Sequence, residues 1–301
     1  MRALGIDTSN YTTSVAVIED GVARQYRRLL PVPEGKKGLR QSDAVFLHTA
    51  ALPELLEQAL SECGPLDRIG VSLKPRPVEG SYMPAFTVGS GVARVLAAAT
   101  GAELRPTTHQ EGHIAAVLFE AGRMELRAAP FYALHLSGGT TELVYCREGA
   151  HVIAGRTLDI SAGQLIDRLG VFCGLPFPCG AALERLAPEA GTVPPLCAAK
   201  GCDCNFSGLE NRSKKLIEDG VDAGSAARFL FDSIEKTLER MIEAAMTKFG
   251  EAPLVLCGGV MSNRGIREGL SRRFETVSAS PAVSADNAVG VAALALLEEV
   301  C

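Results

Sequence analysis

Residues 2–18 read RALGIDTSNYTTSVAVI, and this stretch decides the fold class. Two short apolar runs flank a segment that begins with an acid and continues with small hydroxyl side chains, which is typical of two strands joined by a turn. A second turn, Glu19-Asp20-Gly21, follows. The chain therefore opens with a β-hairpin whose connection presents hydroxyl groups.

The second half of the chain repeats this pattern around Ser137-Gly138-Gly139-Thr140-Thr141. Strand-like runs, residues 131–136 and 142–146, lie on either side of it. Glycines in such a turn leave backbone N–H groups accessible to a phosphate, and hydroxyl groups can add hydrogen bonds.

A hairpin of this kind is the usual start of the actin-like ATPase fold, and two of them resemble its duplicated form (ASKHA, ribonuclease H-like). We therefore predict an α/β protein with two lobes around a nucleotide cleft. The expected N-terminal lobe is residues 1–127, and the C-terminal lobe is 128–301 with an inserted helical and loop region at 160–250.

Composition supports a globular α/β chain and excludes a global basic field. The 301 residues are 47% hydrophobic and only 5% aromatic, and the formal net charge is −5. A nucleic-acid partner would therefore need a local basic patch. The candidate clusters, which are as often ordinary solvated surface, are Lys36, Lys37 and Arg40, then Lys74 and Arg76, then Arg212, Lys214 and Lys215.

The nine cysteines are expected to be reduced, because no secretory leader begins the chain and the count is odd. Cys202-Asp203-Cys204, with Cys197 upstream, lacks the paired C-x-x-C spacing of structural zinc sites. No apolar run approaches the roughly 18 to 20 residues of a membrane span. We expect a cytoplasmic protein with no membrane partner.

Two of the five histidines, His109 and His113, stand four residues apart before an apolar, Ala-rich run. If the run is helical, both imidazoles lie on one face and can close on one metal ion. A pair of partly exposed histidines near a helix start explains the spacing equally well. A third protein ligand would favour a metal site over this alternative, and Asp286 is the candidate.

Further helices are expected at residues 44–56, 88–99, 157–169, 227–246 and 288–300. The helix at 157–169 would carry Asp159 and Asp167, and Lys74-Pro75-Arg76-Pro77 forms a stiff loop. Residues 253–257 run as a strand into Gly258-Gly259, which suits either a nucleotide-facing turn or an ordinary tight turn.

Eight short motifs in order resemble the TsaD family of tRNA threonylcarbamoyladenosine synthases, once described as O-sialoglycoprotein endopeptidases (Gcp-like). They are Gly5-Ile6-Asp7-Thr8-Ser9, His109-x-Glu111-Gly112-His113, Ser137-Gly138-Gly139-x-Thr141-x-Leu143, Ala162-Gly163-x-x-x-Asp167, Pro178-x-Gly180, Phe206-Ser207-Gly208-Leu209, Gly258-Gly259-Val260-x-x-Asn263-Arg264 and Asp286-Asn287. They cover nearly the whole chain.

The resemblance implies transfer of a threonylcarbamoyl group from its adenylate to the N6 amine of the adenosine beside the tRNA anticodon. It implies one divalent metal, iron or zinc, held by His109, His113 and Asp286, and an ATP or adenylate nucleotide. Catalytic roles would fall to Asp7, Ser9 and Asp167. Nucleotide contacts would come from Ser137, Gly138, Gly139, Thr141, Asp167, Gly180, Gly258, Gly259 and Asn263. Taken singly, these residues have plainer explanations; an Asp before a helix, for example, is more often an N-cap.

The chain also departs from the family pattern. Asn10-Tyr11-Thr12 stands where acids are usual, and Leu73-Lys74-Pro75-Arg76-Pro77 replaces a glycine-rich stretch. Thr140, Ile160 and Gln164 replace a His, an Asp and a Glu. A divergent member, a carbamoyl-type transferase with another acceptor, is therefore an alternative, as are a metallopeptidase and a nucleotide-binding scaffold.

The family resemblance also implies partners. Besides tRNA and threonylcarbamoyl-adenylate, these are a TsaB-like paralogue and a TsaE-like P-loop ATPase. The helical regions near 42–62 and 90–100 could supply a surface for them.

Overall fold

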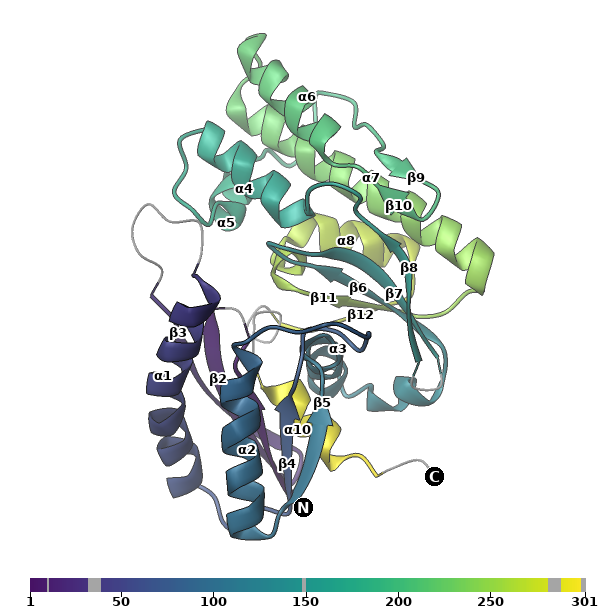
Figure 1. Ribbon diagram of the computed structural model, residues 1–301. Coiled ribbons are helices and arrows are strands. Elements are labelled where there is room, and N and C mark those ends of the chain that lie inside the picture. Colours follow the sequence, from purple (N-terminus) through teal and green to yellow (C-terminus); the bar gives the residue numbers. More distant parts are fainter. Residues whose placement is uncertain (10, 32–38, 148–149, 281–287, 299–301) are drawn as a thin grey trace. The chain divides into compact units, whose positions relative to one another are not determined.

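The computed structural model describes residues 1–9, 11–31, 39–147, 150–280 and 288–298. The chain forms two compact units, the first made of residues 1–124 and 282–301 and the second of residues 125–281. Each unit is built on a five-stranded sheet (Figure 1). Among the described helices, none combines the length and the hydrophobicity that crossing a membrane requires.

The first sheet has the order β3-β2-β1-β4-β5. Its strands are β1 (Arg2–Asp7), β2 (Thr12–Glu19), β3 (Val22–Leu29), β4 (Arg68–Ser72) and β5 (Glu103–Thr107). β1 pairs antiparallel with β2 and parallel with β4. The predicted opening hairpin is thus confirmed, and it forms the centre of the sheet rather than its edge.

Helices cover both faces of the first sheet (Figure 1). On one face, α1 (Gln41–Ser61) and α2 (Phe86–Thr100) bury the apolar side chains of Leu4 and Ile6. On the other face lies α10 (Val289–Leu296), and α3 (His109–Glu120) packs against α10. The alternation of side chains along β1 explains this division, because Asp7 and Gly5 point away from Leu4 and Ile6.

Glycines let α10 approach closely. A Cβ on Gly5 would lie 2.4 Å from the carbonyl oxygen of Ala288, and one on Gly290 would lie 1.8 Å from that of Gly112. Neither position could hold a side chain without moving backbone. The last helix therefore packs with the first unit, whereas we expected it in the C-terminal lobe; sequence periodicity does not show which sheet a helix covers.

The second sheet has the order β12-β11-β6-β7-β8. Its strands are β6 (Phe131–Leu136), β7 (Thr141–Arg147), β8 (Ala150–Arg156), β11 (Leu254–Cys257) and β12 (Thr276–Ser278). β6 pairs antiparallel with β7 and parallel with β11. The path of the chain repeats that of the first sheet, with the predicted second hairpin again at its centre.

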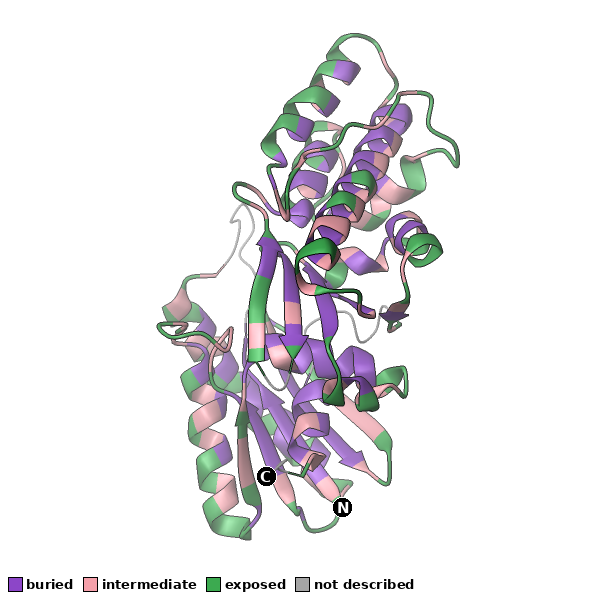
Figure 2. Ribbon diagram, turned by 90° about the vertical axis from the view of Figure 1, so that its right-hand side faces the viewer, coloured by how far each residue is buried: buried purple, intermediate pink, exposed green. Residues whose placement is uncertain are grey.

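One face of the second sheet is covered by helices that bury a large apolar core (Figure 2). Tyr132, Phe206 and Leu230 are among its fully buried members. The surrounding elements are α4 (Ala162–Phe172), α5 (Gly180–Leu186), α6 (Ser207–Glu218), α7 (Ala223–Phe249) and α8 (Arg264–Arg273), the short pair β9 (Ala199–Lys200) and β10 (Asp203–Cys204), and the 3₁₀ turn η2 (Gly259–Ser262). Another 3₁₀ turn, η1 (Met124–Ala128), precedes β6.

The predicted helix at 157–169 begins later than expected. Ser161 is its N-cap, with Gln164 completing a capping box, so α4 starts at Ala162. Asp159 precedes the helix and instead accepts hydrogen bonds from the backbone N–H groups of Phe206 and Ser207. Its carboxylate therefore anchors the start of α6, a role that a helical pattern could not indicate.

Candidate active site

The histidine pair lies at the start of α3, as the sequence indicates. Thr108 caps the helix and forms a capping box with Glu111, so the helix begins at His109. His109 and His113 are one turn apart, both are buried, and their Nε2 atoms are 3.0 Å apart. The two rings meet edge to face. Adjacent nitrogen ligands of one metal ion, each at about 2.1 Å, have a comparable separation.

Asp7 stands behind the first imidazole. Its Oδ2 lies 2.9 Å from His109 Nδ1, and Ser9 Oγ lies 2.9 Å from the same nitrogen. The carboxylate also accepts hydrogen bonds from the Ser72 hydroxyl and the Ser9 backbone N–H, both at 2.8 Å. A carboxylate at Nδ1 fixes the proton there and leaves the Nε2 lone pair for a ligand.

Burial alone would raise the pKa of Asp7, but the charge of His109 and the hydrogen bonds from His109, Ser9 and Ser72 hold it well below its usual range. Asp7 is therefore a buried carboxylate. Ser72 was not among the predicted site residues. Its position signals it, because β4 runs parallel to β1 and their carboxyl ends meet at one edge of the sheet.

The basic loop after β4 is joined to the same helix. The backbone N–H groups of His109 and Gln110 donate to the carbonyl oxygens of Lys74 and Pro75, each at 3.0 Å. The loop is non-helical, as its two prolines indicate. It thus satisfies donors in the first turn of α3 that would otherwise lack partners.

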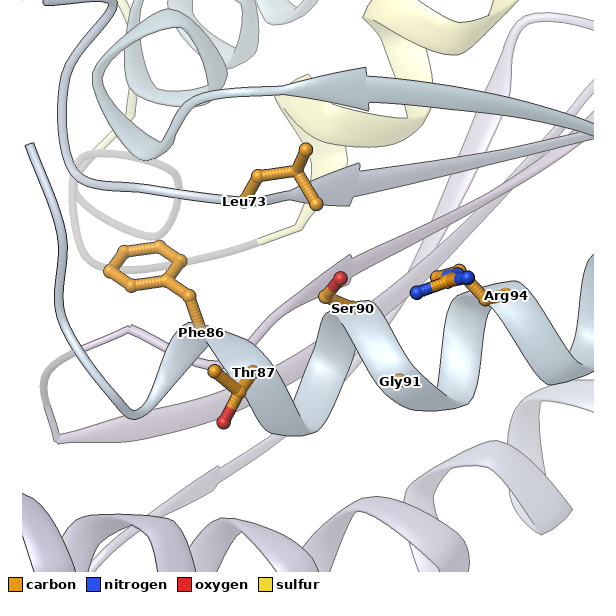
Figure 3. A pocket seen from close by; sticks show the side chains of 6 residues that line it. All are labelled: Leu73, Phe86, Thr87, Ser90, Gly91 and Arg94. Carbon is orange, nitrogen blue, oxygen red and sulfur yellow. The ribbon is translucent and has the colours of Figure 1, made fainter. Parts of the chain in front are cut away.

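A hollow of about 420 Å³ lies beside α2, between this helix and Leu73 (Figure 3). Phe86 contacts both this hollow and the histidine pair. Its ring lines the hollow and packs edge-on against His109, with 6.2 Å between ring centroids. Ser90 and Arg94 line the same hollow (Figure 3). Phe86 is a second site residue that the sequence did not single out.

In the second unit, the turn after β6 rests on the start of α4. The Ser137 hydroxyl accepts hydrogen bonds from the N–H groups of Gly139 and Thr140, and the Gly138 carbonyl accepts one from Ser161. Thr141 Oγ1 accepts the N–H of Ala162 at 2.8 Å. Within the described structure, the Cα atoms of Gly138 and Gly139 face open space, so a ligand can approach this backbone closely.

Other predicted nucleotide contacts lie on neighbouring elements of this unit. Asp167 on α4 accepts the N–H of Cys179 at 2.8 Å, immediately before Gly180 begins α5. Burial raises the pKa of Asp167, and that N–H partly offsets the shift. Gly258, at φ +92°, packs against the Leu136 carbonyl beside the turn after β6.

Asn263 has a clear structural task, because its Oδ1 accepts the N–H of Ile266 and caps α8. Its amide group keeps N–H donors for a further partner. Asp286, the predicted third metal ligand, lies outside the described residues. Among the described residues, no group of three His, Cys, Asp or Glu side chains has the arrangement of a metal site. The predicted metal and nucleotide roles thus stay predictions.

Comparisons with known proteins agree with this picture. A family model described as TsaD, tRNA N6-adenosine threonylcarbamoyltransferase, matches residues 37–293. An enzyme of that name from Thermus thermophilus is 34% identical over 283 residues, covering 89% of this chain and 83% of the relative. Another from Methanopyrus kandleri is 29% identical over 310 residues, covering 97% and 86%.

Among solved structures, full-length HypF in its phosphate- and nucleotide-bound form is similar with a TM-score of 0.62 at 12% identity, covering 98% of this chain and 45% of that one. Such a likeness concerns the fold alone, and with the repeated strand order it confirms the duplicated actin-like ATPase fold. The extent of the sequence matches shows more: the chain belongs to the TsaD family of tRNA N6-adenosine threonylcarbamoyltransferases.

Proposed function

We propose that this protein transfers a threonylcarbamoyl group from its adenylate to the N6 amine of the adenosine next to the tRNA anticodon, with the help of one divalent metal ion. The observation that carries the proposal is the convergence of His109 and His113, whose Nε2 atoms are 3.0 Å apart, in front of the ionised Asp7. Family membership supports the reaction class.

The donor set suits a borderline metal such as iron or zinc. His109 and His113 would hold it, and Asp286 would complete the set. A metal ion bound there would polarise the carbonyl of the carbamoyl group.

Asp7 is proposed as a positioning residue rather than a base. Its oxygens are occupied by hydrogen bonds and its pKa is depressed. It holds the proton of His109 on Nδ1 and fixes the plane of the ring. Ser9, whose hydroxyl shares the same nitrogen, completes this arrangement.

The nucleotide would be bound by the second unit. Open space before Gly138 and Gly139 suits a phosphate, and the half-buried carboxylate of Asp167 suits a ribose hydroxyl. Ser137, Thr141, Gly180, Gly258, Gly259 and Asn263 complete the proposed contacts.

A metallopeptidase is less well supported, because Glu111, the acid near the histidines, is engaged in capping α3. Its Oε2 accepts hydrogen bonds from the Thr108 N–H and hydroxyl and from the Thr107 hydroxyl. A peptidase of this type needs a carboxylate free to activate water.

A second candidate is transfer to a different acceptor. It is favoured by the residues that replace acids usual in the family: Tyr11 at the end of the β1–β2 connection, Ile160 before α4, and Gln164, whose side chain completes the capping box of α4.

A TsaB-like paralogue and a TsaE-like ATPase remain proposed partners.

The test measures metal content, ATP binding and threonylcarbamoyl transfer to unmodified tRNA, with the other pathway components supplied. Wild-type protein is compared with His113→Ala and, as a matched loss of an imidazole in the second unit, His151→Ala. We expect His113→Ala to lose the metal and more than about a hundredfold of activity, and His151→Ala to keep both.

The outcomes separate the two candidates. If the wild type binds metal and ATP but does not modify the tRNA, the second candidate, transfer to a different acceptor, would be supported. Full metal content in His113→Ala would show that the histidine pair is not a ligand set.

A further inference from the structure

The hydroxyl of Thr8, in the connection after β1, bonds to the start of another element. Thr8 is fully buried. Its Oγ1 donates to the carbonyl oxygen of Ala85 at 2.9 Å and accepts the N–H of Gly89 at 3.1 Å. This member of the hydroxyl-rich connection is therefore turned inward, toward α2.

Thr8 gives α2 a cap that the helix does not supply itself. The N-cap residue is Ala85, which makes no side-chain capping bond. The Ala85 carbonyl and the Gly89 N–H are the pair that closes the first turn of an α-helix, and the Thr8 hydroxyl bonds to both. The helix can come this close because a Cβ on Gly89 would lie only 2.9 Å from Thr8 Oγ1. One side chain thus ties the start of α2 to the end of β1.

The neighbours of Thr8 in the chain contact α3 instead. Side chains alternate along an extended chain, so Thr8 shares the side of Ile6, which also packs on α2, and Asp7 and Ser9 face the other way. Asp7 and Ser9 both bond to Nδ1 of His109. Three consecutive residues therefore hold α3, α2 and α3 again.

α2 and α3 meet a second time at the imidazole of His109. Phe86, in the first turn of α2, is buried, and its ring packs edge-on against His109. In Figure 3 this ring stands on the side of α2 that faces Leu73. The contacts form a closed set, from Thr8 to α2, from Phe86 to His109, and from His109 to the residues beside Thr8. A shift of the helix start would therefore move the ring that packs on the imidazole.

We propose that Thr8 is a positioning residue for the histidine pair. Its hydroxyl fixes the first turn of α2 and so holds the Phe86 ring against His109. The imidazole then keeps the orientation that places its Nε2 3.0 Å from that of His113. This inference rests on the proposed function, which makes the pair a metal site. Loss of a group that orients a histidine ligand lowers metal affinity by about 10- to 100-fold.

A purely stabilising role is the alternative, and the same hairpin offers a matched control. Thr13 is also fully buried, and its Oγ1 lies 2.8 Å from Nδ1 of His48 on α1. Thr8→Val and Thr13→Val each remove one buried hydroxyl and keep the shape of the side chain, so both should lower stability. Only Thr8→Val acts on the helix that carries Phe86.

The experiment has one readout with metal and one without. Zn²⁺ affinity is measured by competition with a chelator. In the metal-free protein, the nuclear Overhauser effect between the rings of Phe86 and His109 reports their contact. The variants are Thr8→Val, Thr8→Ser, Thr13→Val, Phe86→Leu and the double variant Thr8→Val/Phe86→Leu, and denaturant unfolding is recorded for each.

We expect Thr8→Val and Phe86→Leu each to weaken Zn²⁺ binding by about tenfold. The double variant should weaken it no further, because both substitutions act on one contact. Thr8→Ser keeps the hydroxyl and should bind Zn²⁺ as the wild type does. Thr13→Val should lose stability but keep both the Zn²⁺ affinity and the ring contact.

Equal Zn²⁺ affinities of Thr8→Val and the wild type would overturn the inference, as would losses that multiply in the double variant. If Thr8→Val does not fold, Phe86→Leu decides, because an unchanged affinity there would show that the ring does not support the imidazole.

Failure of the proposed function is distinguishable, since the wild-type protein would then bind no Zn²⁺. The metal-free readout still tests Thr8 in that case. Loss of the ring contact in Thr8→Val but not in Thr13→Val would support its role, and retention of the contact in both would overturn it.

Discussion

The two sheets follow the same path but carry different chemical groups at corresponding places. At the end of β1 stands Asp7, a buried carboxylate hydrogen-bonded to an imidazole. At the end of β6 stands the uncharged turn of Ser137, Gly138 and Gly139, and both glycines face open space. The duplicated backbone thus offers two equivalent positions, and the side chains make one suited to a metal centre and the other to a phosphate.

The two sheets also differ in how they are covered. The second sheet packs on large side chains such as Tyr132 and Phe206. On one face, the first sheet packs on a helix through Gly5 and Gly70, where backbone meets backbone. That face of the first sheet should therefore tolerate added volume poorly, and the predictions below test this close packing and the contrast in charge.

The largest effect is expected for Gly290→Ala. The new Cβ would overlap the Gly112 carbonyl, so α10 and α3 must separate, at a cost of about 3 kcal/mol. Chemical denaturation measures the change. Gly91→Ala is the control, because a Cβ there meets no described atom within 4 Å and alanine should stabilise α2 by up to about 1 kcal/mol. Equal effects of the two substitutions would contradict the close-packing argument.

Asp7→Asn should come next, with about 2 kcal/mol lost at neutral pH, because charge-assisted hydrogen bonds with His109 and Ser72 are weakened. The pKa of Asp7 is depressed, so its contribution is complete above the unfolded pKa of about 4 and is lost as pH falls through the folded value. The stability difference between wild type and variant should therefore shrink only in acid.

The same substitution should lower metal affinity by about 10- to 100-fold, since the orienting partner of His109 is changed. Metal titration of the purified variant measures this second effect. A variant that binds metal as tightly as the wild type would show that the carboxylate serves stability alone.

A smaller effect is expected for Asp159→Asn in the second unit. Burial by itself would raise the pKa of Asp159, but hydrogen bonds from the Ser207 side chain and from the N–H groups of Ser207, Phe206 and Ile160 together lower it to about 2. This exposed carboxylate acts as a helix cap, so about 1 kcal/mol should be lost at neutral pH. Its contribution also disappears as pH falls from about 4 toward 2. Unlike Asp7→Asn, the variant should leave metal binding unchanged.

The smallest effect is expected for Gln164→Glu, which restores the acid usual in the family. Glutamate completes a capping box as glutamine does, so stability should change by no more than about 0.5 kcal/mol. The transfer assay gives the informative readout. A gain in tRNA modification would indicate that the substitution altered the reaction, and no gain would indicate that position 164 serves α4.

The sequence predicted what depends on local patterns. Both hairpins, the loop of Lys74 and Pro75 and the place of the histidine pair at the front of a helix follow from residue alternation, proline geometry and the apolar run after His113. The hydrogen-bond partners of Asp7 could not be predicted from such patterns, because Ser72 and Asp7 meet only when β1 and β4 pair. The structural tasks of Asp159 and Asn263 were missed for the same reason, since capping contacts depend on where a helix begins.

The placement of α10 has a consequence for how the protein is made. Its residues follow the whole second unit in sequence, yet they cover the sheet formed by the first strands. While the ribosome is still translating the second unit, Gly5 and Gly70 therefore lie on a sheet face that lacks its helix. The second unit can complete its core as soon as it emerges, whereas the first must wait, so the usual order of co-translational folding is reversed.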